Sequence, residues 1–274
     1  MKISILTVSL NAGVELLSTV NSVLEQEEVD YELIIKDGGS KDGSLEQLPQ
    51  DDRIQICISK DSGIYDAMNQ AKKYMTGDFA LYLNCGDVFY DAKVLKSIVD
   101  YIDCYKNDKS ETIYYADCYT VNRKSLLCFP RQFNDFVCFT TTLCHQATIY
   151  PQRLLKERDF LLDYKVAADF EYYVHAYCNG YSLKHIPCVV VKYKGNGASE
   201  TSKNRKLGIK EANRALKSNF NKHRYYINWI KMQLCGIGIK RLLVQSELLY
   251  PFYSKIAEIY YSIFAKREQR RENK

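Results

Sequence analysis

The sequence predicts an α/β fold in which helices flank a mostly parallel sheet and a helical extension follows at the C-terminus. Three observations support this prediction. Strand and helix patterns alternate through the first 100 residues, polar residues follow the predicted strands, and residues 203–274 have a helical pattern rich in basic residues. Of the 274 residues, 46% are hydrophobic and 26% are charged, which is typical of a globular protein and excludes a disordered, collagen-like or multi-span membrane chain.

The first half of the chain alternates between strands and helices. Residues 2–8 (KISILTV) are rich in β-branched residues, as in a buried strand. Apolar residues recur at helical spacing in two later stretches, namely Leu16, Leu17, Val20, Val23 and Leu24, and then Ile64, Ala67, Met68, Ala71 and Met75. We therefore predict strands at 2–8, 31–36, 54–58 and 79–83 and helices at 14–26, 63–75 and 91–104, joined by right-handed crossovers.

The pattern is looser after about residue 112. Short strands are predicted at 113–119 and 126–130, and a longer one at 186–193. Residues 165–179 are predicted to form a helix, with Gly180 as its C-cap. From residue 203 to the end, the sequence predicts helices.

Basic residues are concentrated in this C-terminal part. Residues 203–274 contain 17 Lys or Arg and five Asp or Glu, although the whole chain has a net charge of only +5. The rest of the chain is therefore acidic. The asymmetry predicts an anionic partner for the extension, and nucleic acid, a phospholipid surface or a polyanionic substrate would each qualify. A solvated basic helix without a partner is the alternative.

The cysteines and the N-terminus indicate the cellular compartment. Ten cysteines are scattered singly without a Cys-x-x-Cys pair, so we interpret them as reduced thiols and do not expect a zinc site. The N-terminal stretch MKISILTVSLN is too short and polar for a signal peptide, and no run of 18 residues is apolar and uncharged. We therefore expect a cytoplasmic protein.

Polar residues follow four of the predicted strands. They are Thr7 to Asn11, Asp37, Asp61, and Asn84 to Asp87. Each group alone could be a turn former, but the carboxyl ends of parallel strands meet at one edge, where ligands bind in such sheets. No GxGxxG or GxxxxGK[ST] motif is present. A phosphate site here would therefore need a metal held by a carboxylate, and Asp87 is the candidate.

The residues quoted next resemble a known family. The matching blocks are ILTVSLN (5–11), IIKDGGSKDGS (34–44), DSGIYDAMN (61–69), TGD (76–78) before LNCGD (83–87), CHQA (144–147) and AADFE (167–171). In their order and spacing over residues 2–201, they resemble the inverting glycosyltransferases of family 2, which have the GT-A fold. The GIYDAMN block is similar to the branch that builds bacterial polysaccharide and O-antigen.

The resemblance implies a role for individual residues. It makes Asp169 the general base and Asp87 the ligand of Mn²⁺ or Mg²⁺. It assigns the nucleotide to Thr7, Val8, Ser9, Asn11, Asp37, Gly39, Asp61, Gly63, Asn69, Asn84 and Cys85, and the diphosphate or acceptor to Tyr65, His145 and Ser199. It also implies a GT-A domain at 1–202, with a nucleotide half at about 1–110 and an acceptor half at about 111–202, followed by a basic amphipathic extension at 203–274.

These residue types suit sugar transfer from a nucleotide-sugar, usually a UDP-sugar. A divalent cation can neutralise the departing diphosphate, and one carboxylate can remove the proton of the acceptor hydroxyl, which gives inversion at the anomeric carbon. Asn84 and Gly86 stand where relatives often carry carboxylates, which leaves Asp87 alone. Glu171 and Asp163 are the alternative bases. Asp37 could instead be a turn former, Asp87 a helix N-cap, Asp169 a first-turn acid, and His145 a structural residue.

The extension suggests where the acceptor lies. Residues 252–264 place Phe252, Ile256, Ile259, Tyr260, Ile263 and Phe264 on one helical face, and Lys266 to Lys274 add five basic residues. Such a helix suits the surface of an anionic membrane, and a lipid-linked or growing cell-surface glycan would be the acceptor. The alternative is a helical cap on the domain or a dimer contact.

Three other functions are compatible with parts of the sequence. A nucleotidyltransferase also binds a nucleotide on an α/β sheet, but no Lys or Arg lies between Thr7 and Leu17. A nucleotide-sugar-binding relative that has lost activity would fit the single carboxylate at Asp87. Nucleic-acid binding is not expected, because no recognisable module is present.

Overall fold

The computed structural model describes residues 1–104, 109–195 and 201–235. Its strands are β1 (Lys2–Ser9), β2 (Asp30–Asp37), β3 (Ile54–Ile58), β4 (Phe79–Tyr82), β5 (Val88–Phe89), β6 (Thr112–Thr120), β7 (Ser125–Leu127), β8 (Thr148–Pro151) and β9 (Ser182–Tyr193). Its helices are α1 (Val14–Leu24), α2 (Ile64–Ala71), α3 (Val94–Cys104), α4 (Asp135–Thr140), α5 (Gln152–Glu157), α6 (Ala168–Cys178), α7 (Ser202–Asn219) and α8 (Lys222–Leu234).

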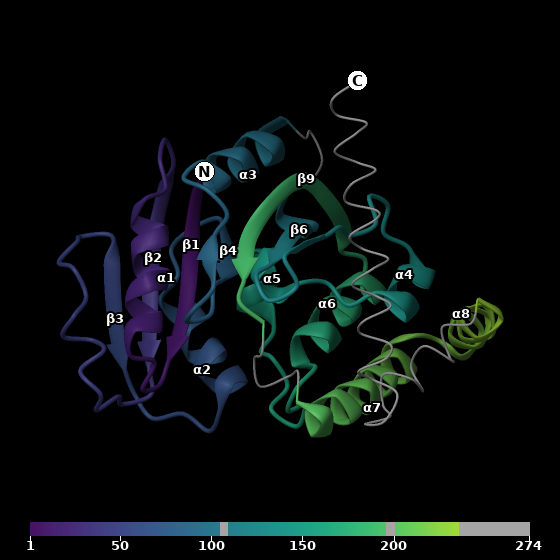
Figure 1. The fold of residues 1–274 in the computed structure, drawn as a ribbon. Coiled ribbons are helices and arrows are strands. Elements are labelled where there is room, and N and C mark those ends of the chain that lie inside the picture. Colours follow the sequence, from purple (N-terminus) through teal and green to yellow (C-terminus); the bar gives the residue numbers. More distant parts are fainter. Residues whose placement is uncertain (105–108, 196–200, 236–274) are drawn as a thin grey trace.

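The strands of these described ranges form one mixed sheet in the order β3-β2-β1-β4-β8-β6-β9-β5, with β7 paired to β6. Figure 1 shows β3, β2, β1 and β4 side by side in this order. β1, β2, β3 and β4 run parallel, as do β6 and β9. β8 is antiparallel to both of its neighbours, β4 and β6. The predicted α/β class with a mostly parallel sheet is therefore confirmed, and β8 joins its two parallel parts.

Each face of the sheet is covered by its own helices and has its own apolar core. Side chains of α1 and α3 pack on one face, where Ile5, Leu33 and Leu81 point. Side chains of α2, α4, α6 and α7 pack on the other, where Leu6 and Tyr82 point. Successive residues of a strand point to opposite faces, so the near-continuous apolar runs predicted as strands cover both faces at once.

The elements predicted within the described residues are present, and four elements were missed; the helices predicted after residue 235 lie outside the described residues. The four missed elements are β5, α4, β8 and α5. The two helices have six residues each and the two strands have two and four, so none is long enough for its periodicity to stand out. The predicted helix 63–75 ends earlier as an α-helix and continues as a 3-10 turn at Lys72–Tyr74.

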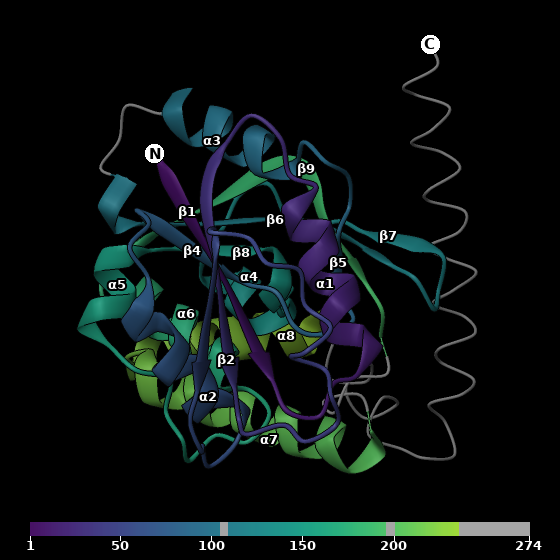
Figure 2. The same ribbon diagram turned by 90° about the vertical axis from the view of Figure 1, so that its left-hand side faces the viewer.

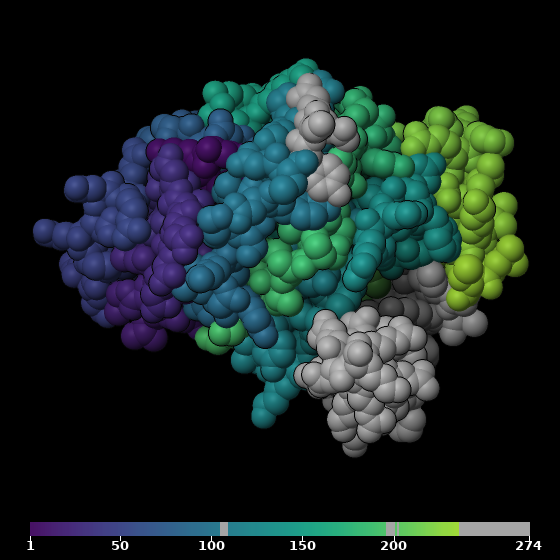
Figure 3. Space-filling view, turned by 90° about the horizontal axis from the view of Figure 1, so that it is seen from above, coloured from purple at the N-terminus to yellow at the C-terminus, as the bar shows by residue number. Residues whose placement is uncertain are grey.

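The described part of the extension packs on the domain. α7 contacts α6 and α8 contacts α4, and Ala215, Leu216, Phe220 and Met232 belong to the same core cluster as Tyr82. Figure 2 shows α7 along the lower edge of the molecule, and Figure 3 shows α8 at the end opposite the first strands. This is the arrangement of a helical cap. The apolar face predicted at 252–264 lies outside the described residues.

Glu32 joins three parts of the parallel sheet. Its carboxylate on β2 accepts hydrogen bonds from Lys2 Nζ at 2.7 Å, Ser4 Oγ at 2.6 Å and the Thr76 backbone N–H at 2.6 Å. Burial alone would raise the pKa of Glu32, but the hydrogen bonds from Lys2, Ser4 and Thr76 outweigh it and lower the pKa to about 2. The ionised carboxylate therefore stabilises the start of the sheet.

Replacing Glu32 should make the free energy of unfolding depend less on pH in the acid range. A carboxyl whose pKa is lowered on folding stabilises the protein above its unfolded pKa of 4.5, and this contribution is lost as the pH falls from 4.5 to about 2. We expect Glu32→Gln to lower the free energy of unfolding by about 1–2 kcal/mol at pH 7 and by much less at pH 2.5 in urea titrations. Glu46→Gln, at an exposed loop position, is the control and should change neither value. Equal losses for Glu32→Gln at both pH values would contradict this account.

Candidate active site

A cavity of about 760 Å³ lies where the loop after β4 faces the N-terminus of α6, a volume typical of small-molecule sites. Six of the predicted site residues line it, and they come from four segments: Tyr65 from α2, Asn84, Cys85 and Asp87 from the loop after β4, His145 from the 3-10 turn before β8, and Asp169 from α6. The sequence separates the first and last of them by 104 positions. The fold therefore joins residues that the sequence could only predict as separate blocks.

Asp169 lies in the first turn of α6 and faces the cavity. Tyr65 Oη donates a hydrogen bond to Asp169 Oδ1 at 3.2 Å, and His145 Nδ1 lies 3.9 Å from Oδ2. Burial raises the pKa of Tyr65, and the negative charge of Asp169 adds to the increase, so this phenol remains protonated. The two alternative bases do not line the cavity. Glu171 binds Arg158, and Asp163 binds Arg214.

The segment before Asp169 is held by a residue of the extension. The buried carboxylate of Glu211, on α7, accepts hydrogen bonds from three consecutive backbone N–H groups, those of Lys165 at 2.8 Å, Val166 at 2.9 Å and Ala167 at 3.0 Å. A carboxylate at a helix N-terminus satisfies N–H groups that have no partner within the helix. α7 therefore holds the segment that leads into the helix that carries Asp169.

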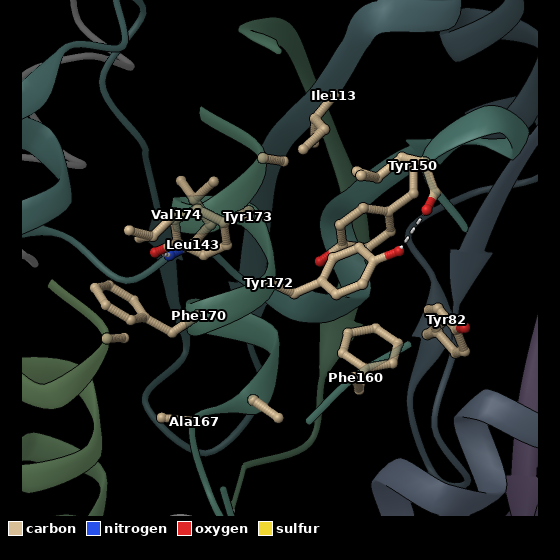
Figure 4. Packing of buried hydrophobic residues seen from close by; sticks show 14 of the residues in the cluster. Tyr82, Ile113, Leu143, Tyr150, Phe160, Ala167, Phe170, Tyr172, Tyr173 and Val174 are labelled. Atoms are coloured by element: carbon tan, nitrogen blue, oxygen red, sulfur yellow. Dashed lines mark hydrogen bonds between the residues drawn. The ribbon is translucent and has the colours of Figure 1, made fainter. Parts of the chain in front are cut away.

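His145 is enclosed by aromatic rings at the back of the cavity. Its ring is stacked on Tyr82 at 5.2 Å, and Phe160 and Tyr150 lie at 6.1 and 6.3 Å. Figure 4 shows Tyr82, Tyr150 and Phe160 together with Tyr172 in this cluster. Neither ring nitrogen of His145 has a hydrogen-bond partner among the described residues.

Asp87 lies deep in the cavity wall and is 4% exposed. Its Oδ1 accepts a hydrogen bond from the Lys194 backbone N–H at 2.9 Å, and its Oδ2 accepts one from Gln146 Nε2 at 2.8 Å. Burial raises the pKa of Asp87 to about 6, although both hydrogen bonds oppose the increase. Asp87 precedes β5, while α3 begins at Val94, so it is not the N-cap of that helix.

The charges around the cavity favour a bound cation. Its acidic residues are Glu15, Asp87 and Asp169, and its basic residues are Lys165 and Lys194. Both lysines already have partners, because Lys194 Nζ binds the Glu15 carboxylate and Lys165 Nζ binds the Leu162 carbonyl. Within the described ranges, no group of three or more His, Cys, Asp or Glu side chains could hold a metal alone. Asp87 fits a hard cation that a phosphate ligand and water also coordinate.

Asn11, Asp37 and Gly39 connect two loops beside the cavity. Asp37 has no exposed surface, and its carboxylate accepts hydrogen bonds from the backbone N–H groups of Gly39 at 2.8 Å and Ser40 at 2.6 Å and from Ser40 Oγ at 2.6 Å. Asn11 Oδ1 accepts from the Lys41 backbone N–H at 2.9 Å. The turn-forming role left open for Asp37 is therefore present. Its contact with a nucleotide stays a prediction.

Asp61 is held by a fully buried lysine. Lys36, on β2, binds Asp61 Oδ2 and also donates to the Ser59 carbonyl at 2.6 Å. Asp61 Oδ1 accepts from the backbone N–H of Gly63 at 3.1 Å, and Gly63 has a positive φ of 135° just before α2. The predicted residues Asp61 and Gly63 thus form one rigid turn at the carboxyl end of β3.

Cys85 lies between this loop region and the cavity. Its Sγ donates to the Val8 carbonyl at 3.3 Å, and the Ser9 carbonyl accepts from the Gly38 backbone N–H at 2.9 Å. Burial raises the pKa of Cys85 to about 11, and the charges of Glu15, Asp37 and Asp87 contribute. The hydroxyl of Thr7 is buried without a partner among the described residues. Thr7, Val8 and Ser9 therefore lie at the end of β1, which contacts both Cys85 and the loop at Gly38.

Asn69 has a different contact from the one predicted. Its Nδ2 donates to the Phe160 carbonyl at 2.9 Å, and its Oδ1 accepts from the Phe160 backbone N–H at 2.8 Å. The residue is buried on the side of α2 that faces the core, and it does not line the cavity. Asn69 therefore has a structural contact, and its predicted contact with a nucleotide stays a prediction. Ser199, the remaining predicted residue, lies outside the described residues.

Sequence reasoning missed three residues that shape the site. Gln146 and Lys194 hold Asp87, and Glu211 holds the segment before Asp169. Gln146 lies in a block that was quoted but given no role. Glu211 also carried a signal, since it is the single acidic residue between residues 203 and 246.

Two further expectations can be compared with the described residues. All ten cysteines are free, as expected for reduced thiols. Within the described ranges, no helix is long and apolar enough to cross a membrane.

Comparisons with known proteins identify the family. The family model described as glycosyl transferase family 2 matches residues 4–157, which is more than half of the chain. A PGL/p-HBAD biosynthesis glycosyltransferase of Mycobacterium bovis is 29% identical over 197 residues, covering 69% of this chain and 72% of that protein. A Mycobacterium tuberculosis protein of the same description matches equally well.

Solved structures show the same fold. The structure of S. aureus TarS in complex with UDP-GlcNAc has a TM-score of 0.62 and 18% identity, covering 82% of this chain and 69% of that chain. The mannosyltransferase PcManGT from Pyrobaculum calidifontis, solved with GDP-Man and Mn²⁺, has a TM-score of 0.61 and 12% identity, covering 96% and 86%. With the family match and this architecture together, the chain belongs to glycosyl transferase family 2 and has the GT-A fold.

Proposed function

We propose that this glycosyltransferase moves one sugar from a UDP-linked donor to a lipid-linked or growing cell-surface polysaccharide, with inversion at the anomeric carbon. The observation that carries this proposal is the shared cavity of Asp169 and Asp87, in which the alternative bases Glu171 and Asp163 have no part. The UDP and UDP-GlcNAc bound to TarS support the choice of donor.

The reaction needs one base and one leaving group. Asp169 accepts the proton of the acceptor hydroxyl while its oxygen forms a bond to the anomeric carbon. The bond from that carbon to the diphosphate breaks, and its electron pair leaves with the nucleoside diphosphate. Attack and departure occur on opposite sides of the carbon, so the configuration inverts. Only one catalytic carboxylate is required, unlike the pair used in glycoside hydrolysis.

A diphosphate would bind beside Asp87 only together with a cation. Among the described residues, three carboxylates and two lysines line the cavity, and Lys194 pairs with Glu15, so a diphosphate would gain from a bound cation. Asp87 would hold Mn²⁺ or Mg²⁺, and this ion would neutralise the charge that develops on the leaving diphosphate. Lys194 and Gln146 orient the Asp87 carboxylate toward that task. The Mn²⁺ bound with GDP-Man in PcManGT supports this cofactor.

The acceptor is proposed to lie at a membrane surface. α8 exposes Tyr226, Trp229, Ile230 and Leu234, and basic residues are frequent throughout the extension. Aromatic and aliphatic side chains beside positive charge suit the interface of an anionic bilayer. A peripheral position on the cytoplasmic face of the membrane would bring the cavity to a lipid-linked glycan.

The division of the chain into a domain at 1–202 and an extension at 203–274 also stays a proposal.

A product assay would test this function. The protein is incubated with a panel of UDP-, GDP- and TDP-sugars and lipid-linked acceptors, with Mn²⁺, Mg²⁺ or EDTA. We expect a nucleoside diphosphate to be released, and NMR of the product to show the opposite anomeric configuration. Release of pyrophosphate would indicate a nucleotidyltransferase instead. A rise in melting temperature with a nucleotide-sugar but no transfer to any acceptor would favour a binding protein that has lost activity.

A further inference from the structure

Within the described residues, the imidazole of the histidine beside the proposed base has no hydrogen-bond partner. Both ring nitrogens of His145 are buried and unpaired within the described residues, and Nδ1 lies 3.9 Å from Asp169 Oδ2. This distance is too long for a hydrogen bond. Buried polar atoms without partners are uncommon in folded proteins because they lose their bonds to water. An unpaired imidazole in the wall of a ligand cavity therefore indicates a partner that arrives or moves during the reaction.

The surroundings of His145 fix its ring in place. Tyr82 stacks on one face with an interplanar angle of 23°, and the rings of Phe160 and Tyr150 lie at 74° and 49° to it. Their packing leaves the imidazole little freedom to rotate. The direction of Nδ1 toward Asp169 is therefore set by the core.

Asp169 already receives one neutral hydrogen bond. Tyr65 Oη donates to Oδ1 at 3.2 Å, while Oδ2 faces His145. Burial lowers the pKa of His145, although the charge of Asp169 opposes this, so the imidazole is neutral near pH 7. A neutral donor can orient a carboxylate by a hydrogen bond. A full positive charge would also lower the pKa of the carboxylate and make the carboxylate a weaker base.

We propose that His145 is a positioning residue for Asp169: with the proton on Nδ1, it donates to Oδ2 when the substrates are bound and, together with Tyr65, aims the carboxylate at the acceptor hydroxyl. This inference rests on the proposed function, because it assigns the base role to Asp169. The proton taken from the acceptor stays on Asp169 in this scheme, and His145 neither gains nor loses one.

Two substitutions that separate the shape of the ring from its hydrogen bonding would test the role of His145. His145→Phe keeps an aromatic ring in the enclosure and removes both nitrogens, while His145→Gln restores a donor. We expect His145→Phe to lower kcat about 10- to 100-fold with the donor KM changed less than twofold, and His145→Gln to recover part of the loss. Tyr65→Phe should lower kcat in the same way. His175→Phe, whose ring bonds Asn219 on the far side of α6, and Tyr181→Phe are the controls and should match the wild type.

A double-mutant cycle and NMR would separate positioning from simple support of the fold. In an Asp169→Asn background, His145→Phe should reduce the remaining activity little further, since both changes act on one group. The ¹⁵N spectrum of the full chain with bound UDP should place the imidazole proton on Nδ1 of His145, with a shift that changes in Asp169→Asn.

Three outcomes would overturn the proposal. They are wild-type kcat in a folded His145→Phe, a raised donor KM with unchanged kcat, which would make His145 a donor-binding residue, and an imidazole proton on Nε2 in the UDP complex. Failure of the proposed function looks different, because the wild type itself would then transfer no sugar. The NMR measurement would still report on the contact between His145 and Asp169 in that case.

Discussion

Asp169→Asn should reduce sugar transfer by about 10²- to 10⁴-fold, the range typical for loss of a general base. The amide has nearly the shape of the carboxylate and can still accept the hydrogen bond from Tyr65, but it cannot take a proton from the acceptor. Binding of the nucleotide-sugar should change less than twofold, because the predicted nucleotide residues lie on other segments. Steady-state kinetics and calorimetric titration of UDP-sugar would measure the two effects.

Asp163→Asn is the matched control for this experiment. Asp163 lies six positions before Asp169, has a largely exposed carboxylate that pairs with Arg214, and does not line the cavity. Its variant should keep wild-type kinetics. Full turnover in Asp169→Asn would remove this residue from the mechanism, and equal losses in both variants would point to damage of the segment rather than of the base.

Asp87→Asn is expected to cost about 10²-fold or more in kcat/KM and to abolish the effect of divalent ions on donor binding. In the wild type, Mn²⁺ or Mg²⁺ should strengthen UDP-sugar binding and raise the melting temperature of the complex. In the variant, the melting temperature with UDP-sugar should be the same with the metal and with EDTA. Differential scanning fluorimetry with both metals would measure this.

The same variant should not be less stable than the wild type. Burial raises the pKa of Asp87 to about 6, which means that the folded protein holds an unfavourable buried charge at pH 8. Asn removes that charge and can keep a hydrogen bond to the Lys194 backbone N–H. Asp100→Asn, at a half-exposed carboxylate paired with Lys96 on α3, is the control. Unchanged metal dependence in Asp87→Asn would show that the ion binds elsewhere.

Long, regular elements were predictable from the sequence and short ones were not. The helical spacing of Leu16, Val20 and Val23 predicts α1 because one face of this helix must enter the core. β8 has four residues ending in Pro151, and its place between β4 and β6 depends on pairing with strands distant in the sequence. Such pairing is a tertiary effect that local patterns do not encode.

The site was predictable as residue types but not as contacts. The blocks around Asp87 and Asp169 predicted that both belong to one site, and they line one cavity. The chemical roles assigned to them remain proposals. The contact of Asn69 was not predictable, because its partner is the backbone of Phe160, 91 positions away. Glu211 stands out as an isolated acidic residue, but its partners depend on how α7 packs on α6, which the sequence does not indicate.

The contact between Glu211 and the backbone of residues 165–167 has a consequence for biosynthesis of the protein. A chain emerging from the ribosome completes β1 to β9 before α7 is released, so the three backbone N–H groups lack their acceptor during that interval. The sheet of the nascent chain could therefore form before the segment that precedes Asp169 is ordered. The order of residues 165–167 thus depends on a helix that lies outside the segment matched by the family.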